Sequence, residues 1–267
     1  WPTAKCEEGY YTRVCTTTAW EEGLQTFTAV GTDDDGNQTH ASINIEFTNI
    51  APHDVAVTMW DDNDNLIDAG AQLTWQIQED QEIELSARAE DSIDDLTDLS
   101  YEWSFGFKTD GRESRVPMVW NDAGMKTILV KAIDSEGEDS GWVERWVDVQ
   151  NLEPQIEQLP EVMAVAEGQS FTLSGVAWDT PSDMESLIVC WDTDPGADTD
   201  GIGSADDDCD VEGANLTWSW QNSGVYNVVF HATDDNGARN SSSAAVTVLN
   251  LPPLVMVNTP SKAIAGE

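Results

Sequence analysis

Residues 223–237 read Ser-Gly-Val-Tyr-Asn-Val-Val-Phe-His-Ala-Thr-Asp-Asp-Asn-Gly, and this stretch contains the pattern that decides the fold. Alternate side chains form one mostly apolar set, which a period of two places on a single face of a β-strand: Tyr226, Val228, Phe230 and Ala232. Asp234 then supplies a side-chain acceptor for a tight turn, and Gly237 supplies a residue free to take a positive φ. The stretch therefore predicts a strand followed by a hairpin turn.

The same arrangement occurs three times, about 100 residues apart, which indicates a tandem repeat. Each copy has a Trp, a Gly three or four residues later, an Asp ten residues after that Gly, and a second Gly three residues after the Asp. These landmarks are Trp20, Gly23, Asp33 and Gly36; Trp120, Gly124, Asp134 and Gly137; and Trp220, Gly224, Asp234 and Gly237. The copies close with Asn-x-x-Pro at 49–52, 151–154 and 250–253, where Pro ends the strand ladder.

Alternation predicts equivalent core-facing strand residues in the other two copies: Gln25, Phe27, Ala29 and Gly31, and Lys126, Ile128, Val130 and Ala132. The second hairpin strands are expected at 42–47, 143–149 and 244–249. Further short strands are expected upstream, at 55–59, 83–89, 99–104, 156–158, 170–173 and 187–191. Helical periodicity is absent, so we predict an all-β chain of antiparallel Ig-like β-sandwiches in a linear array.

The repeat also predicts where the units begin and end. Residues 1–50 are expected to be the C-terminal half of one unit, 51–152 and 153–251 two whole units, and 252–267 the first strand of a further unit.

The closing strands resemble a known family. Residues 123–137 and 223–237 are similar to the last strands of PKD-type immunoglobulin-like domains, a pattern that cadherin-like and other bacterial Ig-like repeats share. Tyr101-Glu-Trp-Ser-Phe-Gly106 resembles the W-D-F-G-D-G segment of that family, with Ser104 in place of the usual Asp and no second Asp after Gly106. The resemblance implies PKD-like modules of archaeal or bacterial surface proteins, in adhesins, surface layers or secreted hydrolases.

The charge excludes several functions. The 267 residues include 51 acidic and 11 basic side chains, a formal net charge of −40. Such a field repels nucleic acid and anionic lipid, so we expect neither as a partner. No apolar run approaches the roughly 18 residues of a membrane span. Adaptation to a saline medium and clusters of cation sites both explain the charge.

The cysteines and sequons point to an extracellular or cell-surface location. Two short-range pairs, Cys6 with Cys15 and Cys190 with Cys209, lack zinc-site spacing and favour local disulfides formed in an oxidising compartment. Asn-x-Ser/Thr sequons occur at Asn37, Asn215 and Asn240 and are candidate glycosylation sites.

Three acidic clusters are candidate structural calcium sites, because calcium takes six to eight hard oxygens at short range. Two precede the central strand of a whole unit, where the family resemblance also implies calcium: Asp91, Asp94, Asp95 and Asp98, and Asp179, Asp183 and Glu185. The third lies between Cys190 and Cys209: Asp192, Asp194, Asp198, Asp200, Asp206 and Asp208. The alternative for each is a solvated acidic loop.

Other polar residues are interpreted structurally. Asp33, Asp134 and Asp234 are expected to form turns rather than to act as ligands, and the Asp61–Asp64 segment is expected to form a turn as well. The linker residues Asn49, Asn151 and Asn250 are expected to cap strand ends, with a carbonyl ligand for an ion at a junction as the alternative. Trp103 and Trp191 are expected in the cores.

No enzyme motif is present: the chain lacks G-x-S-x-G, a P-loop and His-Glu-x-x-His, and its three histidines are isolated in sequence. We therefore expect a non-catalytic structural segment of an extracellular surface-layer, filament or adhesin protein, a rod of PKD-like domains stabilised by calcium. Its expected partners are copies of itself, neighbouring repeats of one long chain, or a glycan or surface protein. The alternative is an accessory carbohydrate- or protein-binding module of a secreted hydrolase, using exposed Trp side chains.

Overall fold

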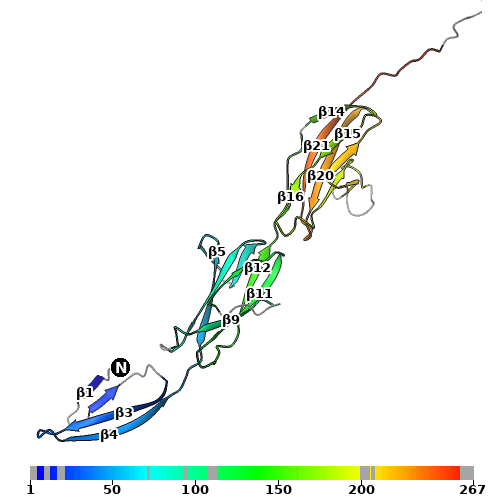
Figure 1. Cartoon of the computed structure of the whole chain (residues 1–267). Helices are drawn as coiled ribbons and strands as arrows, with labels where there is room; N and C mark the ends of the chain where they lie inside the picture. Colours follow the sequence, from blue (N-terminus) through cyan, green and yellow to red (C-terminus); the bar gives the residue numbers. More distant parts are fainter. Residues whose placement is uncertain are drawn as a thin grey trace, which may run out of the picture. The chain divides into compact units, whose positions relative to one another are not determined.

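The computed structural model describes residues 5–8, 13–16, 22–70, 73–92, 95–106, 113–160, 162–198, 205 and 208–258. These residues form twenty-one β-strands and no helix, which confirms the predicted all-β class (Figure 1). Among them, accordingly, there is no helix with the length and apolarity needed to cross a membrane. The chain divides into two compact units, residues 1–150 and 151–267.

The first unit begins with two antiparallel hairpins. One joins β1 (Lys5–Glu8) to β2 (Arg13–Thr16), with Cys6 directly opposite Cys15 in the backbone register. The other joins β3 (Gly23–Thr32) to β4 (Gln38–Phe47).

The expectation that one face of β3 packs on a core is wrong. Only Gln25 and Phe27 on this strand are even half-buried, while Leu24 is 67% exposed. The alternation places these side chains on one face, but β3 and β4 pair only with each other among the described strands, as a two-stranded sheet. Burial needs a partner layer, which the local pattern does not encode.

Residues 53–150 form a sandwich of two four-stranded sheets (Figure 1). One sheet has the order β10-β8-β5-β6, with β5 (His53–Asp61), β6 (Leu66–Ile67), β8 (Ile83–Glu90) and β10 (Arg115–Met118). The other has the order β7-β12-β11-β9, with β7 (Thr74–Gln78), β9 (Ser100–Ser104), β11 (Gly124–Ile133) and β12 (Val143–Gln150). All neighbours are antiparallel except β7 and β12, which pair in parallel.

The second unit repeats this design with shorter flanking sheets. Its main sheet has the order β14-β21-β20-β17-β18, with β14 (Val162–Ala166), β17 (Ile188–Asp192), β18 (Val211–Glu212), β20 (Gly224–Thr233) and β21 (Arg239–Leu249). Here too the single parallel pair of the sheet joins its early strand β14 to its last strand β21. Two smaller sheets pair β13 (Gln155–Ile156) with β16 (Ala177–Trp178), and β15 (Phe171–Ser174) with β19 (Asn215–Trp218).

Each sandwich has its own hydrophobic core with a tryptophan at its centre. Trp103 on β9 and Trp191 on β17 are completely buried, as predicted. Trp103 lies opposite Val130 and Trp191 opposite Phe230 in the ladder to the next strand. The predicted alternation holds in both sandwiches, where the following side chains are fully buried: Ile128, Val130, Ala132, Val228, Phe230 and Ala232.

The predicted strands are present within one or two residues at most ends, although β4 and β21 start four or five residues before the expected position. Residues 252–258, expected as the start of a further strand, form none, since no described segment pairs with them.

Candidate cation-binding sites

The aspartates of the hairpin turns bind both their own turn and a distant linker. Asp134 Oδ1 accepts the backbone N–H groups of Gly137 and Glu138 at 2.7 and 2.8 Å, which confirms its role in the turn. Its Oδ2 accepts a hydrogen bond from Asn49 Nδ2 at 2.7 Å. Burial raises the pKa of Asp134, but the hydrogen bonds from Asn49 and the turn outweigh burial and lower it overall.

The second unit has the same arrangement. Asp234 Oδ1 accepts the N–H of Ala238 at 2.7 Å, and Oδ2 accepts Asn151 Nδ2 at 2.8 Å. The strand-end cap expected of Asn49 and Asn151 is therefore incorrect. Each side chain instead ties the linker before a sandwich to a hairpin turn more than 80 residues later, separated by 85 and 83 positions.

A further aspartate follows the strand that precedes each acidic loop. Asp91 comes directly after β8 and accepts the N–H of Ser92 at 2.7 Å, and Asp179 follows β16 and accepts the N–H of Thr180 at 2.8 Å. In both, Oδ2 is buried and has no hydrogen-bond partner among the described residues. The side-chain amide of the linker Asn has a similar atom, because Oδ1 of Asn49 is buried and accepts no hydrogen bond from the described residues. Oδ1 of Asn151 is likewise buried and accepts no hydrogen bond from the described residues.

These carboxylates are held in an environment that opposes their charge. Burial raises the pKa of Asp91, and the nearby carboxylates of Asp95 and Asp134 raise it further. Burial likewise raises the pKa of Asp179, with Asp183 and Asp234 adding to the effect. The charge of His53 opposes this rise at Asp91. At Asp179 the charges that act on the carboxyl are those of neighbouring carboxylates, and they favour its neutral form.

A third acidic side chain, Asp95 in the first sandwich and Asp183 in the second, is buried in each loop. Asp95 accepts hydrogen bonds from Ser92 Oγ at 2.8 Å and Ser135 Oγ at 3.1 Å, and Asp183 accepts one from Thr180 Oγ1 at 3.1 Å. The two sandwiches therefore have the same residue types near each linker, connected by a hydrogen bond and by the effect of their charges on one another, although the described carboxylate oxygens of each set do not all lie within 4.8 Å of one another: Asn49, Asp91, Asp95 and Asp134, and Asn151, Asp179, Asp183 and Asp234. We call these the two linker sites.

The linker sites only partly match the predicted ligand sets. Asp91, Asp95, Asp179 and Asp183 belong to them, whereas Asp98 and Glu185 are exposed on the same loops and Asp94 lies outside the described residues. The sequence favoured structural roles for the linker Asn and the turn Asp, with a ligand role as the less favoured alternative for both. The signal that identifies them is their recurrence, since each whole unit has a linker Asn before its first strand and a turn Asp 83–85 positions later.

The third predicted cluster lies in a loop closed by a disulfide. Cys190 is bonded to Cys209, as predicted, with Cα atoms 5.6 Å apart. Asp192 is 1% exposed; its Oδ1 accepts the N–H of Asp194 at 2.8 Å, while its buried Oδ2 has no hydrogen-bond partner among the described residues. Burial raises the pKa of Asp192, followed by the charges of Asp210, Asp208 and Asp194.

The other predicted residues of this loop differ in burial. Asp208 is 1% exposed, whereas Asp194 and Asp198 are exposed, and Asp200 and Asp206 lie outside the described residues. Asp210, which ends the same acidic run but was not among the predicted ligands, fixes the start of the loop by accepting hydrogen bonds from the N–H and the hydroxyl of Thr193 at 2.7 and 2.6 Å. A surface cavity of about 320 Å³ opens beside Asp192, lined by Asp192, Pro195, Val229, His231, Ser241 and Ser243.

The first sandwich has a lysine at the ladder position that His231 occupies in the second sandwich. Lys131 lies opposite Glu102 in the ladder and binds Glu102 at 3.3 Å and Asp139 at 3.0 Å. In the second sandwich His231 lies opposite Cys190 in the equivalent pairing. Lys131 thus balances the charges of Glu102 and Asp139 in the first sandwich. At the equivalent position of the second sandwich, His231 lies opposite Cys190, where the disulfide-closed acidic loop begins.

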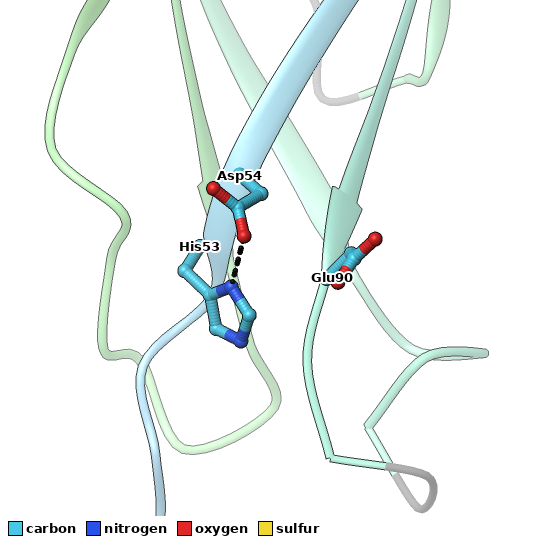
Figure 2. Close-up of side chains that lie close together, drawn as sticks. All are labelled: His53, Asp54 and Glu90. Atoms are coloured by element: carbon cyan, nitrogen blue, oxygen red, sulfur yellow. Dashed lines mark hydrogen bonds and ion pairs between the residues drawn. The ribbon is translucent and has the colours of Figure 1, made fainter.

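One group of side chains brings a histidine beside two carboxylates. His53, Asp54 and Glu90 offer ligand atoms that all lie within 4.8 Å of one another (Figure 2). Among the described residues, this is the group of three His, Cys, Asp or Glu side chains whose ligand atoms lie so close together. The interpretation of His53 as isolated is therefore wrong in space, although the sequence separates it from Glu90 by 37 positions.

The remaining predicted sites are distributed over the surface. Asn37 and Asn215 are exposed, while Asn240 is half-buried and its Nδ2 donates to the carbonyl of Pro154 at 3.0 Å. The pairing of Cys6 with Cys15 stays a prediction that their directly opposed backbone positions allow. Trp142, Trp146 and Trp178 are exposed by 43–47%.

Comparison with known proteins gives likenesses of fold at low identity. No family model matches the chain, and no curated protein matches it. Among solved structures, the fibronectin(III)-like modules of Clostridium thermocellum CbhA are 16% identical and cover 68% of this chain and 94% of their own, with a TM-score of 0.29. The PKD domain of an M14-like peptidase from a Thermoplasmatales archaeon is 16% identical over 38% of this chain and 98% of its own, with a TM-score of 0.28. Drosophila N-cadherin EC1-3 is 14% identical over 94% and 89%, with a TM-score of 0.29. These proteins have Ig-like β-sandwich modules, and a likeness of fold does not determine function.

Proposed function

We propose that this chain is a non-catalytic structural segment of an extracellular surface protein, in which successive Ig-like β-sandwich modules are stabilised by calcium at their linkers. The observation that carries the proposal is the repeated linker site. In both sandwiches a linker Asn and an aspartate after a strand end have buried oxygens that accept no hydrogen bond from the described residues, beside a buried turn aspartate. Two independent copies of this arrangement are hard to explain as solvated acidic loops.

Calcium suits the donor set of these sites. It takes six to eight oxygens from carboxylates, amide carbonyls and water in flexible geometry. Asn49, Asp91 and Asp134 come from the linker, a strand end and a hairpin turn, so one cation held by them would join three segments that are distant in sequence. Its charge would also remove the repulsion that raises the pKa of Asp91.

The disulfide-closed loop is proposed as an additional calcium site in the second unit. Asp192 has a buried carboxylate oxygen without a hydrogen-bond partner, and Asp208 and Asp210 are close enough to raise its pKa. The cross-link between Cys190 and Cys209 keeps these groups together even when their charges repel.

The disulfide also supports an extracellular location, because such bonds persist in oxidising compartments. Copies of the chain and neighbouring repeats of one longer chain are the partners we propose. Sedimentation velocity in calcium and in EGTA checks self-association, and a single monomeric species at all concentrations would contradict it.

Calorimetry tests the calcium sites. We expect calcium to raise the melting temperature relative to EGTA, since a ligand at 100 times its dissociation constant stabilises the fold by about 2.7 kcal/mol. Asp91→Asn should remove this response in the first unit and Asp179→Asn in the second. Asp122→Asn, an exposed aspartate outside the sites, is the matched control. Identical melting in calcium and EGTA, with no binding heat on titration, would disprove the calcium part of the proposal.

Exposed tryptophans support a second candidate function, an accessory carbohydrate-binding module. Trp146 and Trp178 are each more than 40% exposed and could stack on sugar rings. Polysaccharide pull-down that is lost in Trp146→Ala or Trp178→Ala would favour an accessory binding module, and no retention on any polysaccharide would count against it.

A further inference from the structure

Three side chains at the start of β5 and the end of β8 lie close together. His53 and Glu90 are direct partners in the antiparallel register of these strands. His53 Nδ1 lies 3.0 Å from Asp54 Oδ2, and the carboxylate of Glu90 completes a group whose ligand atoms are within 4.8 Å of one another (Figure 2).

An irregularity in β5 explains how two consecutive residues reach the same place. Neighbouring side chains in a regular strand point to opposite faces. The register of β5 shifts between His53 and Ala56, and Asp54 has a φ of 52°, in the left-handed region that non-glycine residues seldom adopt. A bulge of this kind re-aims a side chain, and here the Asp54 carboxylate comes to lie beside the imidazole.

The second sandwich lacks the arrangement. Counting from the linker Asn-x-x-Pro, the positions of His53 and Asp54 correspond to Gln155 and Ile156. Gln155 lies opposite Trp178 without a shift in register. The ligand group is therefore specific to the first sandwich and is not a consequence of the repeated fold.

The donor set determines which metal the group suits. One imidazole nitrogen with two carboxylate oxygens is a ligand set typical of zinc and neighbouring first-row divalent metals, whereas calcium prefers oxygens alone. Three protein ligands leave a position for water. The His53 and Asp54 side chains are 53% and 77% exposed, so they have room to close around an ion and to release it.

We propose that His53, Asp54 and Glu90 form a surface site for a divalent transition metal of the zinc class, separate from the calcium sites. The net charge of −40 concentrates cations around the chain. The histidine then selects, among the acidic groups of this surface, the place where a nitrogen-preferring metal binds.

Zinc titration of the whole chain tests the site, in buffer with saturating calcium so that the oxygen-only sites are occupied. His53→Gln introduces the residue that the second sandwich has at this position, and we expect it to remove one equivalent of bound zinc or weaken it at least tenfold. Glu90→Gln should do the same. His40→Gln, which removes an exposed histidine of β4, is the matched control and should bind like the wild type.

Spectroscopy with Cu²⁺ supplies a second measurement. We expect an electron paramagnetic resonance signal with coupling to a single imidazole nitrogen, which disappears in His53→Gln but not in His40→Gln. Unchanged thermal melting in EGTA would show that the variants fold. Zinc binding that is identical in wild type, His53→Gln and Glu90→Gln would overturn the proposal and leave the calcium sites unaffected, because those use other residues.

Discussion

Aspartates of this chain behave in opposite ways according to their hydrogen-bond partners. Asp134 is buried, but its pKa is lowered because Asn49 and the turn donate to its carboxylate. Asp91, Asp179 and Asp192 each have an oxygen that accepts no hydrogen bond within the part of the chain that the structure describes, and burial followed by neighbouring negative charge raises their pKa. The first kind stabilises the fold when ionised, whereas the second needs a cation to do so.

Asp179→Asn should therefore reverse its effect when calcium is added. The pKa of Asp179 is raised above 3.8, so in EGTA its contribution is fully present below that pH and is lost as the pH rises through the higher folded value. At pH 7 in EGTA the variant should melt several degrees above the wild type, and in calcium several degrees below it. Calorimetry at pH 3 and 7 checks this, and an unchanged order of stability would contradict it.

Asn49→Ala should weaken the first unit by about 1.5–3 kcal/mol, as expected for a hydrogen bond to a charged group. The pKa of Asp134 is lowered in the fold, so its stabilisation is present above 3.8 and is lost as the pH falls through the lower folded value. The loss caused by the variant should thus be largest near neutral pH and disappear in acid. Urea unfolding at several pH values measures it, with the exposed Asn222→Ala as control.

At the scale of elements, alternation predicted the strands well because both sandwiches bury one face of each hairpin. Ile128 and Val228 show the match, since both are fully buried where a period of two places them. The same pattern failed at Ala29 and Gly31 of β3, which are exposed, because burial depends on tertiary structure that the local sequence does not encode. Local pattern thus decides the strand, and tertiary structure decides whether its face is buried.

The candidate sites were predictable only in part for the same reason. The acidic loops are visible as runs of Asp, and the Cys190–Cys209 bond follows from short spacing. Asn49 lies beside Asp134 only because the fold brings them together. The side chains of His53, Asp54 and Glu90 meet because of a bulge in β5, which the sequence pattern does not predict. Loop ligands can be read from composition, but ligands contributed by distant elements cannot.

The loop of 19 positions closed by Cys190 and Cys209 should contribute about 3 kcal/mol by restricting the unfolded chain. The double variant Cys190→Ser/Cys209→Ser should lower the stability of the second unit by that amount and weaken calcium binding near Asp192. The first unit serves as the internal reference in the same calorimetric scan. A second unit that melts unchanged would show that the cross-link is dispensable.

At the scale of the whole molecule, the two sandwiches have separate hydrophobic cores. Leu85 and Leu216 are both fully buried, one in each core. Each unit has the size and core of an independently folding domain.

Leu85→Ala and Leu216→Ala form a matched pair that tests this independence. Each removes the same buried group, and each should destabilise its own unit by about 2–5 kcal/mol while the other unit melts as before. Two calorimetric transitions, of which one shifts in each variant, are expected. A single transition that shifts equally in both would show that the units unfold together.

The parallel ladders give both sandwiches a mechanical property. Five residues of β7 pair with five of β12, and β14 pairs with β21 in the same way. Once the segments before β7 and β14 are extended, tension along the chain pulls the two strands of each parallel pair in opposite directions, so the hydrogen bonds between them are loaded in shear. Antiparallel neighbours stretched from one end would instead unzip rung by rung at lower force.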